Sequence, residues 1–124
     1  MIDTNFLGVG AGNMGDYIVS NNLKIYEITA IHNWFFEVLG NYGLLIFVLY
    51  MMFTLSILID LFLIYKKNKN NINMKYLAYS LFLSNIAFLF GYVTLSSAYS
   101  FIPYWLMLGI TLAFINFSRQ RKRL

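Results

Sequence analysis

One long apolar run decides what kind of protein this chain can form. It extends over 23 residues from Gly43 to Tyr65, and Asp60 is its only charged residue. An α-helix rises about 1.5 Å per residue, so this run reaches roughly 34 Å and can cross a bilayer core of about 30 Å. Charged residues make up only 11% of the chain, whereas soluble domains carry about 25%. A membrane is therefore the predicted solvent for most of this sequence.

Two further apolar segments complete a pattern of three spans. The second covers residues 76–97, and the third covers residues 103–117 with Pro103 in its first turn, where proline is tolerated. Polar residues inside the second span, such as Asn85, are expected to join helices to one another rather than to line a pore. We therefore predict an all-α membrane protein with three transmembrane helices.

The other residues divide into loops and a tail. Residues 1–42 are expected to form a Gly-rich loop and a short amphipathic segment at the membrane surface. If the first helix begins near Trp34, with Asn33 as its cap, it exceeds the bilayer core and should tilt, project or bend at Gly40 and Gly43. The predicted organisation is an outer region 1–42, transmembrane helices 43–65, 76–97 and 103–117, loops 66–75 and 98–102, and a basic tail 118–124.

The basic residues predict the orientation of the chain. Eight of the nine lie in two clusters, one within residues 66–75 and the other within residues 119–123. Each cluster adjoins an apolar run, so the positive-inside rule places both in the cytoplasm and disfavours a nucleic-acid partner. Residues 1–42, one span earlier, are then extracytoplasmic. The predicted location is the cell membrane, crossed several times, with the C-terminus in the cytoplasm.

Asp60 stands about one helical turn before the first basic cluster. We expect it to be a carboxylate at the membrane interface, near Lys66 and Lys67 and paired with one of them. The alternative is a buried functional acid, because carboxylates within a membrane are rare and often functional.

The only histidine, His32, lies in a polar cluster just before the first apolar run. With its ordinary pKa of about 6.5, a histidine at the outer membrane face can act as a general base towards a hydroxyl. Asn33 and Glu37 share a helical face and could orient the base or bind a sugar, whereas His32 and Glu37 lie about 140° apart on a helix. The alternative is a structural histidine.

The composition also limits the cofactors. The chain has no cysteine and one histidine, so it offers no disulfide and no thiolate nucleophile. A zinc site is improbable for the same reason. We expect neither a metal nor another cofactor.

Residues 8–15 are rich in glycine. Gly10, Gly12 and Gly15 match G-x-G-x-x-G, but no convincing strand precedes them and no βαβ unit surrounds them, so we reject a dinucleotide site. Two alternatives remain. One is a loop whose glycines adopt positive φ, and the other is a nest of backbone amides that faces an anion.

Together these residues resemble the C-terminal part of the O-antigen ligase and polymerase superfamily, and most of all its teichuronic acid and capsular polysaccharide polymerases. The resemblance rests on the Gly8–Gly12 loop, on His32-Asn33 with Glu37, and on Gly43, which follows Asn33 after nine residues. Ile46 replaces the second glycine of the family pattern.

The resemblance implies a glycosyltransferase that needs no metal. Such enzymes transfer a glycan from a polyprenyl diphosphate to an acceptor hydroxyl at the outer membrane face. It implies His32 as the catalytic base. The residues expected to bind substrate are Asn33, Glu37, Gly10, Gly12 and Lys24.

The chain departs from this family in its outer region and in its number of spans. Family members have many more spans, and here Lys24 is the only cation before the first span, although a diphosphate leaving group needs positive charge. We therefore expect a C-terminal portion of a polymerase or ligase, incomplete alone, that needs the missing N-terminal helices in the same or a separate chain. The alternative is a small non-enzymatic integral membrane protein or a decayed fragment.

Overall fold

The computed structural model describes residues 6–21, 33–91 and 101–121, and these ranges contain helices and no strand. The helices are α1 (Met14–Ser20), α2 (Trp34–Lys67), α3 (Ile72–Gly91) and α4 (Ile102–Gln120). They belong to two compact units: a first unit of residues 1–52 and 91–98, and a second unit of residues 53–90 and 99–124. The all-α prediction is confirmed for the described residues. The short helix α1 lies where the sequence predicted only a loop.

Two of the helices, α2 and α3, are long and apolar enough to cross a membrane. The third expected span falls in α4, which is not one of these two. Its last turn carries Ser118, Arg119 and Gln120. The preceding residues from Ile102 to Phe117 reach only roughly 24 Å, less than a bilayer core of about 30 Å. The helices α2 and α3 favour membrane association, and the third span remains a prediction.

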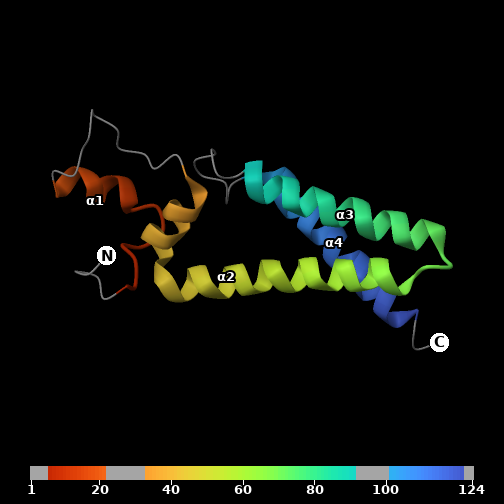
Figure 1. The fold of residues 1–124 in the computed structure, drawn as a ribbon. Helices are drawn as coiled ribbons and strands as arrows, with labels where there is room; N and C mark the ends of the chain where they lie inside the picture. Colours follow the sequence, from red (N-terminus) through yellow and green to blue (C-terminus); the bar gives the residue numbers. More distant parts are fainter. Residues whose placement is uncertain (1–5, 22–32, 92–100, 122–124) are drawn as a thin grey trace. The chain divides into compact units, whose positions relative to one another are not determined.

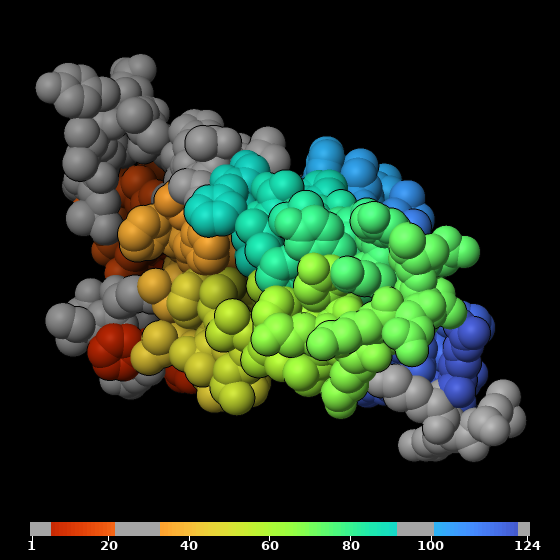
Figure 2. All heavy atoms as spheres, turned by 45° about the vertical axis from the view of Figure 1, so that its right-hand side comes forward, coloured from red at the N-terminus to blue at the C-terminus, as the bar shows by residue number. Residues whose placement is uncertain are grey.

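The second unit contains residues 53–67 of α2 together with α3 and α4 (Figure 1). Figure 2 shows the side chains of α2 and α3 in this unit as one continuous surface. Each helix buries one stripe of residues three or four positions apart, as a packed helix should. The buried apolar members of these stripes are Ile57, Leu61, Ile64, Met74, Ala78, Leu81, Tyr104, Leu108, Phe114 and Ile115.

Aromatic contacts show how these helices run. Tyr65 of α2 and Tyr79 of α3 have ring centroids 5.3 Å apart, close to the connection between the two helices. Phe88 near the end of α3 lies 6.1 Å from Tyr104 near the start of α4. Neighbours in the sequence are therefore antiparallel, and the end of α4 lies at the same end of this unit as the α2–α3 connection.

The outward faces of these helices are also apolar. Exposed large side chains include Leu63 on α2, Leu83 on α3 and Leu112 on α4. A helix that is hydrophobic on all sides belongs inside a large protein or in a membrane. This pattern agrees with the membrane as solvent.

Two polar contacts fix the helices of the second unit against one another. Asn85 Nδ2 donates to Thr111 Oγ1 at 3.2 Å, and Thr111 is completely buried. Asn85 therefore joins α3 to α4, as the sequence predicted. Asp60 Oδ2 accepts from Arg119 Nη2 at 2.7 Å and joins α2 to α4. The predicted pairing of Asp60 with Lys66 or Lys67 is wrong, because the partner comes from a helix much later in the chain.

The contact between Asn85 and Thr111 can be tested with a double-mutant cycle. Asn85→Ala and Thr111→Val each remove one partner, and we expect a coupling free energy of about 0.5–1.5 kcal/mol, the range of hydrogen bonds between membrane helices. Equilibrium unfolding in detergent micelles measures it.

Ser118 supplies the control, because it is also buried on α4 but lies about two turns beyond Thr111. Asn85→Ala and Ser118→Ala should be additive. Additive effects for the Asn85 and Thr111 pair as well would contradict the contact.

Candidate functional site

The start of α2 carries two of the predicted site residues. Asn33 Oδ1 accepts hydrogen bonds from the backbone N–H groups of Phe35 at 3.0 Å and Phe36 at 3.4 Å. The predicted cap of this helix is thereby confirmed, since such bonds satisfy otherwise unpaired donors. Glu37 lies one turn later and donates its backbone N–H to Asn33 O at 2.9 Å. The amide group Nδ2 of Asn33 is on the other branch of the side chain and remains able to donate to a ligand.

His32 and Lys24 lie outside the described residues. The predicted amphipathic segment before Asn33 also falls mostly there. The roles assigned to both side chains therefore remain predictions.

Helix α2 breaks at Gly43, which has φ 82° and ψ 176° instead of helical values. The break folds the start of the helix back against its continuation (Figure 1). The rings of Trp34 and Tyr50 are 4.9 Å apart, whereas a straight helix would separate these positions by roughly 24 Å. Of the outcomes predicted for a helix that begins near Trp34, bending at Gly43 is confirmed.

The Gly-rich loop takes up the hydrogen bonds that the break removes. In an unbroken helix the N–H of Leu44 would donate to Gly40 O. Instead it donates to Phe6 O at 2.9 Å, and Gly40 O accepts from Val9 N at 2.9 Å. Asn41 O likewise accepts from Gly10 N at 3.0 Å. Since buried main-chain polar groups need partners, the loop and the break stabilise one another.

We call the contact between the Gly-rich loop and the break in α2 the joint. Asn41 also connects this joint to α1. The residue is 3% exposed, and its Oδ1 accepts from the N–H of Met14, the first residue of α1, at 3.2 Å. A Cβ at Gly40 would lie 2.9 Å from Met14 Sδ. Asn41 therefore holds the loop through its backbone and α1 through its side chain.

The glycines of the loop have different surroundings. Gly8, Gly10 and Gly12 all have positive φ, of 81°, 95° and 78°, as one of the two alternatives for this loop predicted. A Cβ at Gly8 would stand 2.6 Å from both Asn41 O and Gly43 N, whereas a Cβ at Gly12 would meet nothing within 4 Å. Because the amide of Gly10 is bound within the protein, an anion nest would have to use other amides of the loop.

The structure thus places Asn33, Glu37, Gly10 and Gly12 in the first unit, but at two separate places. The loop is bound at residues 40–44, about two helical turns or roughly 10 Å along α2 from Asn33. Binding of substrate by these four residues remains a prediction.

Asn41 was not among the predicted site residues. Its position could have indicated a structural role, because it is a polar residue between Gly40 and Gly43 at the start of an apolar run.

Metal binding has no described site. Within residues 6–21, 33–91 and 101–121, no group of three His, Cys, Asp or Glu side chains could hold a metal ion.

The chain is similar to the teichuronic acid biosynthesis protein TuaE of Bacillus subtilis (strain 168). The two are 25% identical over an alignment of 126 positions, and this alignment covers 99% of this chain and 25% of the relative. No protein family model matches the chain, and no solved structure matches it. The chain therefore spans about a quarter of the length of this relative, and at this level of identity the similarity assigns it to no family. The ligase and polymerase superfamily expected from the motifs is not confirmed.

Gly8 and Gly12 form a matched pair that tests how the loop is held. Both have positive φ, so Gly8→Ala and Gly12→Ala introduce similar backbone strain of about 1–3 kcal/mol. Only Gly8→Ala also places a methyl group against Asn41 O and Gly43 N. We expect Gly8→Ala to speed hydrogen exchange at the Val9 and Gly10 amides at least tenfold more than Gly12→Ala does. Equal exchange in both variants would contradict the docking of the loop.

Gly43→Ala tests the break itself. Alanine rarely adopts φ 82° with ψ 176°, and its Cβ would stand 2.4 Å from Phe6 O. We expect a loss of about 3 kcal/mol or more in the free energy of unfolding. Gly109→Ala, within α4 and with open space at its Cβ, should instead be neutral or stabilising by up to about 1 kcal/mol. Unfolding in detergent compares the two, and similar stabilities would show that no break requires glycine.

Proposed function

We propose that this chain is part of a cell-envelope glycosyltransferase that extends or transfers a glycan at the outer face of the membrane. The observation that carries the proposal is the similarity of 99% of the chain to a teichuronic acid biosynthesis protein. The apolar helices α2 and α3 support a place in the membrane, where a lipid-linked glycan is available.

In the proposed reaction His32 is the base. Its imidazole takes the proton of an acceptor hydroxyl, and the hydroxyl oxygen forms a bond to the anomeric carbon of the donor glycan. The bond from that carbon to the diphosphate oxygen breaks, and the polyprenyl diphosphate leaves with the electron pair. Asn33 donates its Nδ2 amide to a sugar oxygen, Glu37 accepts from a sugar hydroxyl, and Lys24 attracts the diphosphate.

The break in α2 supports this role. A general base works only when it is held within reach of the proton that it removes. Asn33 caps the helix, and the loop, α1 and the packing of Trp34 fix the first turns of α2. We propose that His32, which directly precedes this cap in the sequence, acts at this end of α2, and that Gly10 and Gly12 border the substrate.

The proposed enzyme needs cations that this chain does not carry on its outer side. Lys24 is the only lysine or arginine before Lys66, and a single ammonium group stabilises a diphosphate poorly. The relative is much longer, since this chain covers 25% of it. We propose that further membrane helices, in the same or a separate chain, contribute the remaining cations.

The proposed topology has three spans. Residues 1–42 lie outside the cell and the C-terminus lies in the cytoplasm. The arrangement of the second unit supports it, because the α2–α3 connection and the end of α4 lie at one end of that unit, together with their basic residues.

Complementation tests the proposed function. The chain is expressed with the N-terminal three quarters of a teichuronic acid polymerase in a strain that lacks the polymerase, and the length of the surface glycan is measured. We expect long glycan to return. His32→Ala should lower the rate of extension roughly 100-fold or more, since general bases contribute about 10²–10⁴-fold.

Two variants at asparagines complete this experiment. Asn33→Ser retains an oxygen that caps the helix but removes the amide donor, so activity should fall while the helix stays intact. Asn73→Ala, at an exposed position of α3, should behave as the unaltered chain. Full activity of the His32→Ala variant at equal protein level would reduce His32 to a structural role. No glycan with any variant, despite stable expression, would favour a small non-enzymatic membrane protein or a decayed fragment.

A further inference from the structure

The second unit carries a strong excess of positive charge. Its sequence contains eight basic residues and a single carboxylate, Asp60. Arg119 pairs with that carboxylate at 2.7 Å. The described lysines of this unit lie at or next to the connection between α2 and α3, at the end where α4 also finishes. No described carboxylate of this unit remains to neutralise them.

Four lysines near this connection fall into two pairs. Lys66 Nζ lies 4.7 Å from the centre of the Phe62 ring, and Lys75 Nζ lies 5.4 Å from the centre of the Tyr65 ring. Lys67 and Lys69 make no ion pair and no ring contact with any residue in the described ranges. Their charges are therefore available to a ligand.

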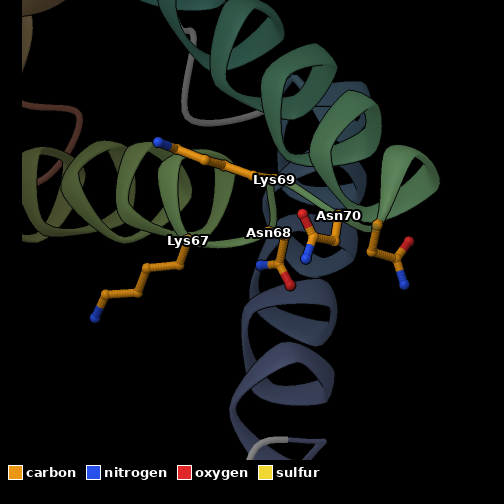
Figure 3. A pocket seen from close by; sticks show the side chains of 5 residues that line it. Lys67, Asn68, Lys69 and Asn70 are labelled. Carbon is orange, nitrogen blue, oxygen red and sulfur yellow. The ribbon is translucent and has the colours of Figure 1, made fainter.

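Lys67 and Lys69 border a hollow of about 440 Å³ at the connection, together with Asn68, Asn70 and Asn71. Figure 3 shows the side chains of Lys67 and Lys69 on opposite sides of the end of α2, with Asn68 and Asn70 beyond that end, at the connection. Their ammonium groups stand on flexible stems that can turn towards an anion in the hollow.

The asparagines differ in their freedom to donate. Asn68 Nδ2 donates to Ile64 O at 2.8 Å and closes the end of α2. Asn71 Oδ1 accepts from Met74 N at 3.1 Å and caps α3, so its Nδ2 remains a donor. Asn70 has no hydrogen bond through its side chain within the described residues. The hollow thus has two amide donors, and the two ammonium groups can turn towards it.

We propose that this hollow binds the phosphate headgroup of an anionic phospholipid. The hollow lies at the connection between α2 and α3, which are both long and apolar enough to cross a membrane. When these helices cross a membrane, the hollow lies at the depth of the lipid headgroups. Lysines just beyond a membrane helix attract anionic lipids, and amide N–H groups are suitable donors to phosphate oxygens. The apolar helices beside the hollow suit a lipid better than free phosphate. This lipid binding is independent of the proposed glycosyltransferase function, because it requires neither a glycan nor His32.

The test uses the purified chain in phosphatidylcholine nanodiscs that contain phosphatidylglycerol as the probe. Native mass spectrometry counts the retained phosphatidylglycerol and gives its affinity. We expect Lys67→Gln with Lys69→Gln to weaken binding roughly thirtyfold, from the usual contribution of two lysines near an anionic surface. Lys66→Gln with Lys75→Gln removes the same charge from the lysines on aromatic rings and should weaken binding less than tenfold.

Two further variants guard against a folding defect. Lys67→Arg with Lys69→Arg keeps the charge and should retain the lipid, and Asn70→Asp adds a carboxylate to the hollow and should weaken binding. Helicity measured by circular dichroism checks each variant. The proposal is overturned if both glutamine variants lose lipid equally, since net charge alone would then explain binding, or if neither loses any. Displacement of the lipid by an equal concentration of inorganic phosphate would overturn the lipid as occupant.

Discussion

Three main-chain hydrogen bonds between the Gly-rich loop and the break in α2 hold the first unit together. A helix interrupted within an apolar run exposes N–H and C=O groups that neither lipid nor apolar side chains can satisfy. Phe6, Val9 and Gly10 supply the missing partners at 2.9–3.0 Å. The break is therefore stable only with the loop in place, and the loop has a defined conformation only because of the break.

The second unit is held in a different way. Its helices are apolar on both the buried and the exposed faces, so hydrophobicity alone sets no register between them. The bond from Asn85 to Thr111 and the ion pair of Asp60 with Arg119 supply that register. The ion pair is partly exposed and contributes little to stability by itself, but it specifies which helices meet at the basic end.

The sequence predicted those features that depend on residues close together in the chain. Length and hydropathy predicted the long helices α2, α3 and α4 but not the short α1, the position of Asn33 predicted a cap, and the pair Gly40 and Gly43 predicted a bend. Contacts between distant segments were not predictable: nothing near Asp60 indicates a partner 59 residues later, and the loop binds through backbone atoms, which leave no side-chain pattern. For the candidate site, Asn33 and Glu37 are placed at the start of α2, while His32 lies outside the described residues.

Because the joint at the break is formed mainly by backbone atoms, it restricts the amino acid at only a few positions. It requires no Cβ at Gly8 and Gly43 and a side chain that accepts a hydrogen bond at Asn41. Gly10 and Gly12 also have positive φ, which side chains rarely adopt, whereas the side chains of Leu7, Val9 and Ala11 take no part in its three hydrogen bonds. Such a joint can persist through extensive divergence, so related chains are better compared by Gly8, Asn41 and Gly43 and their spacing than by overall identity.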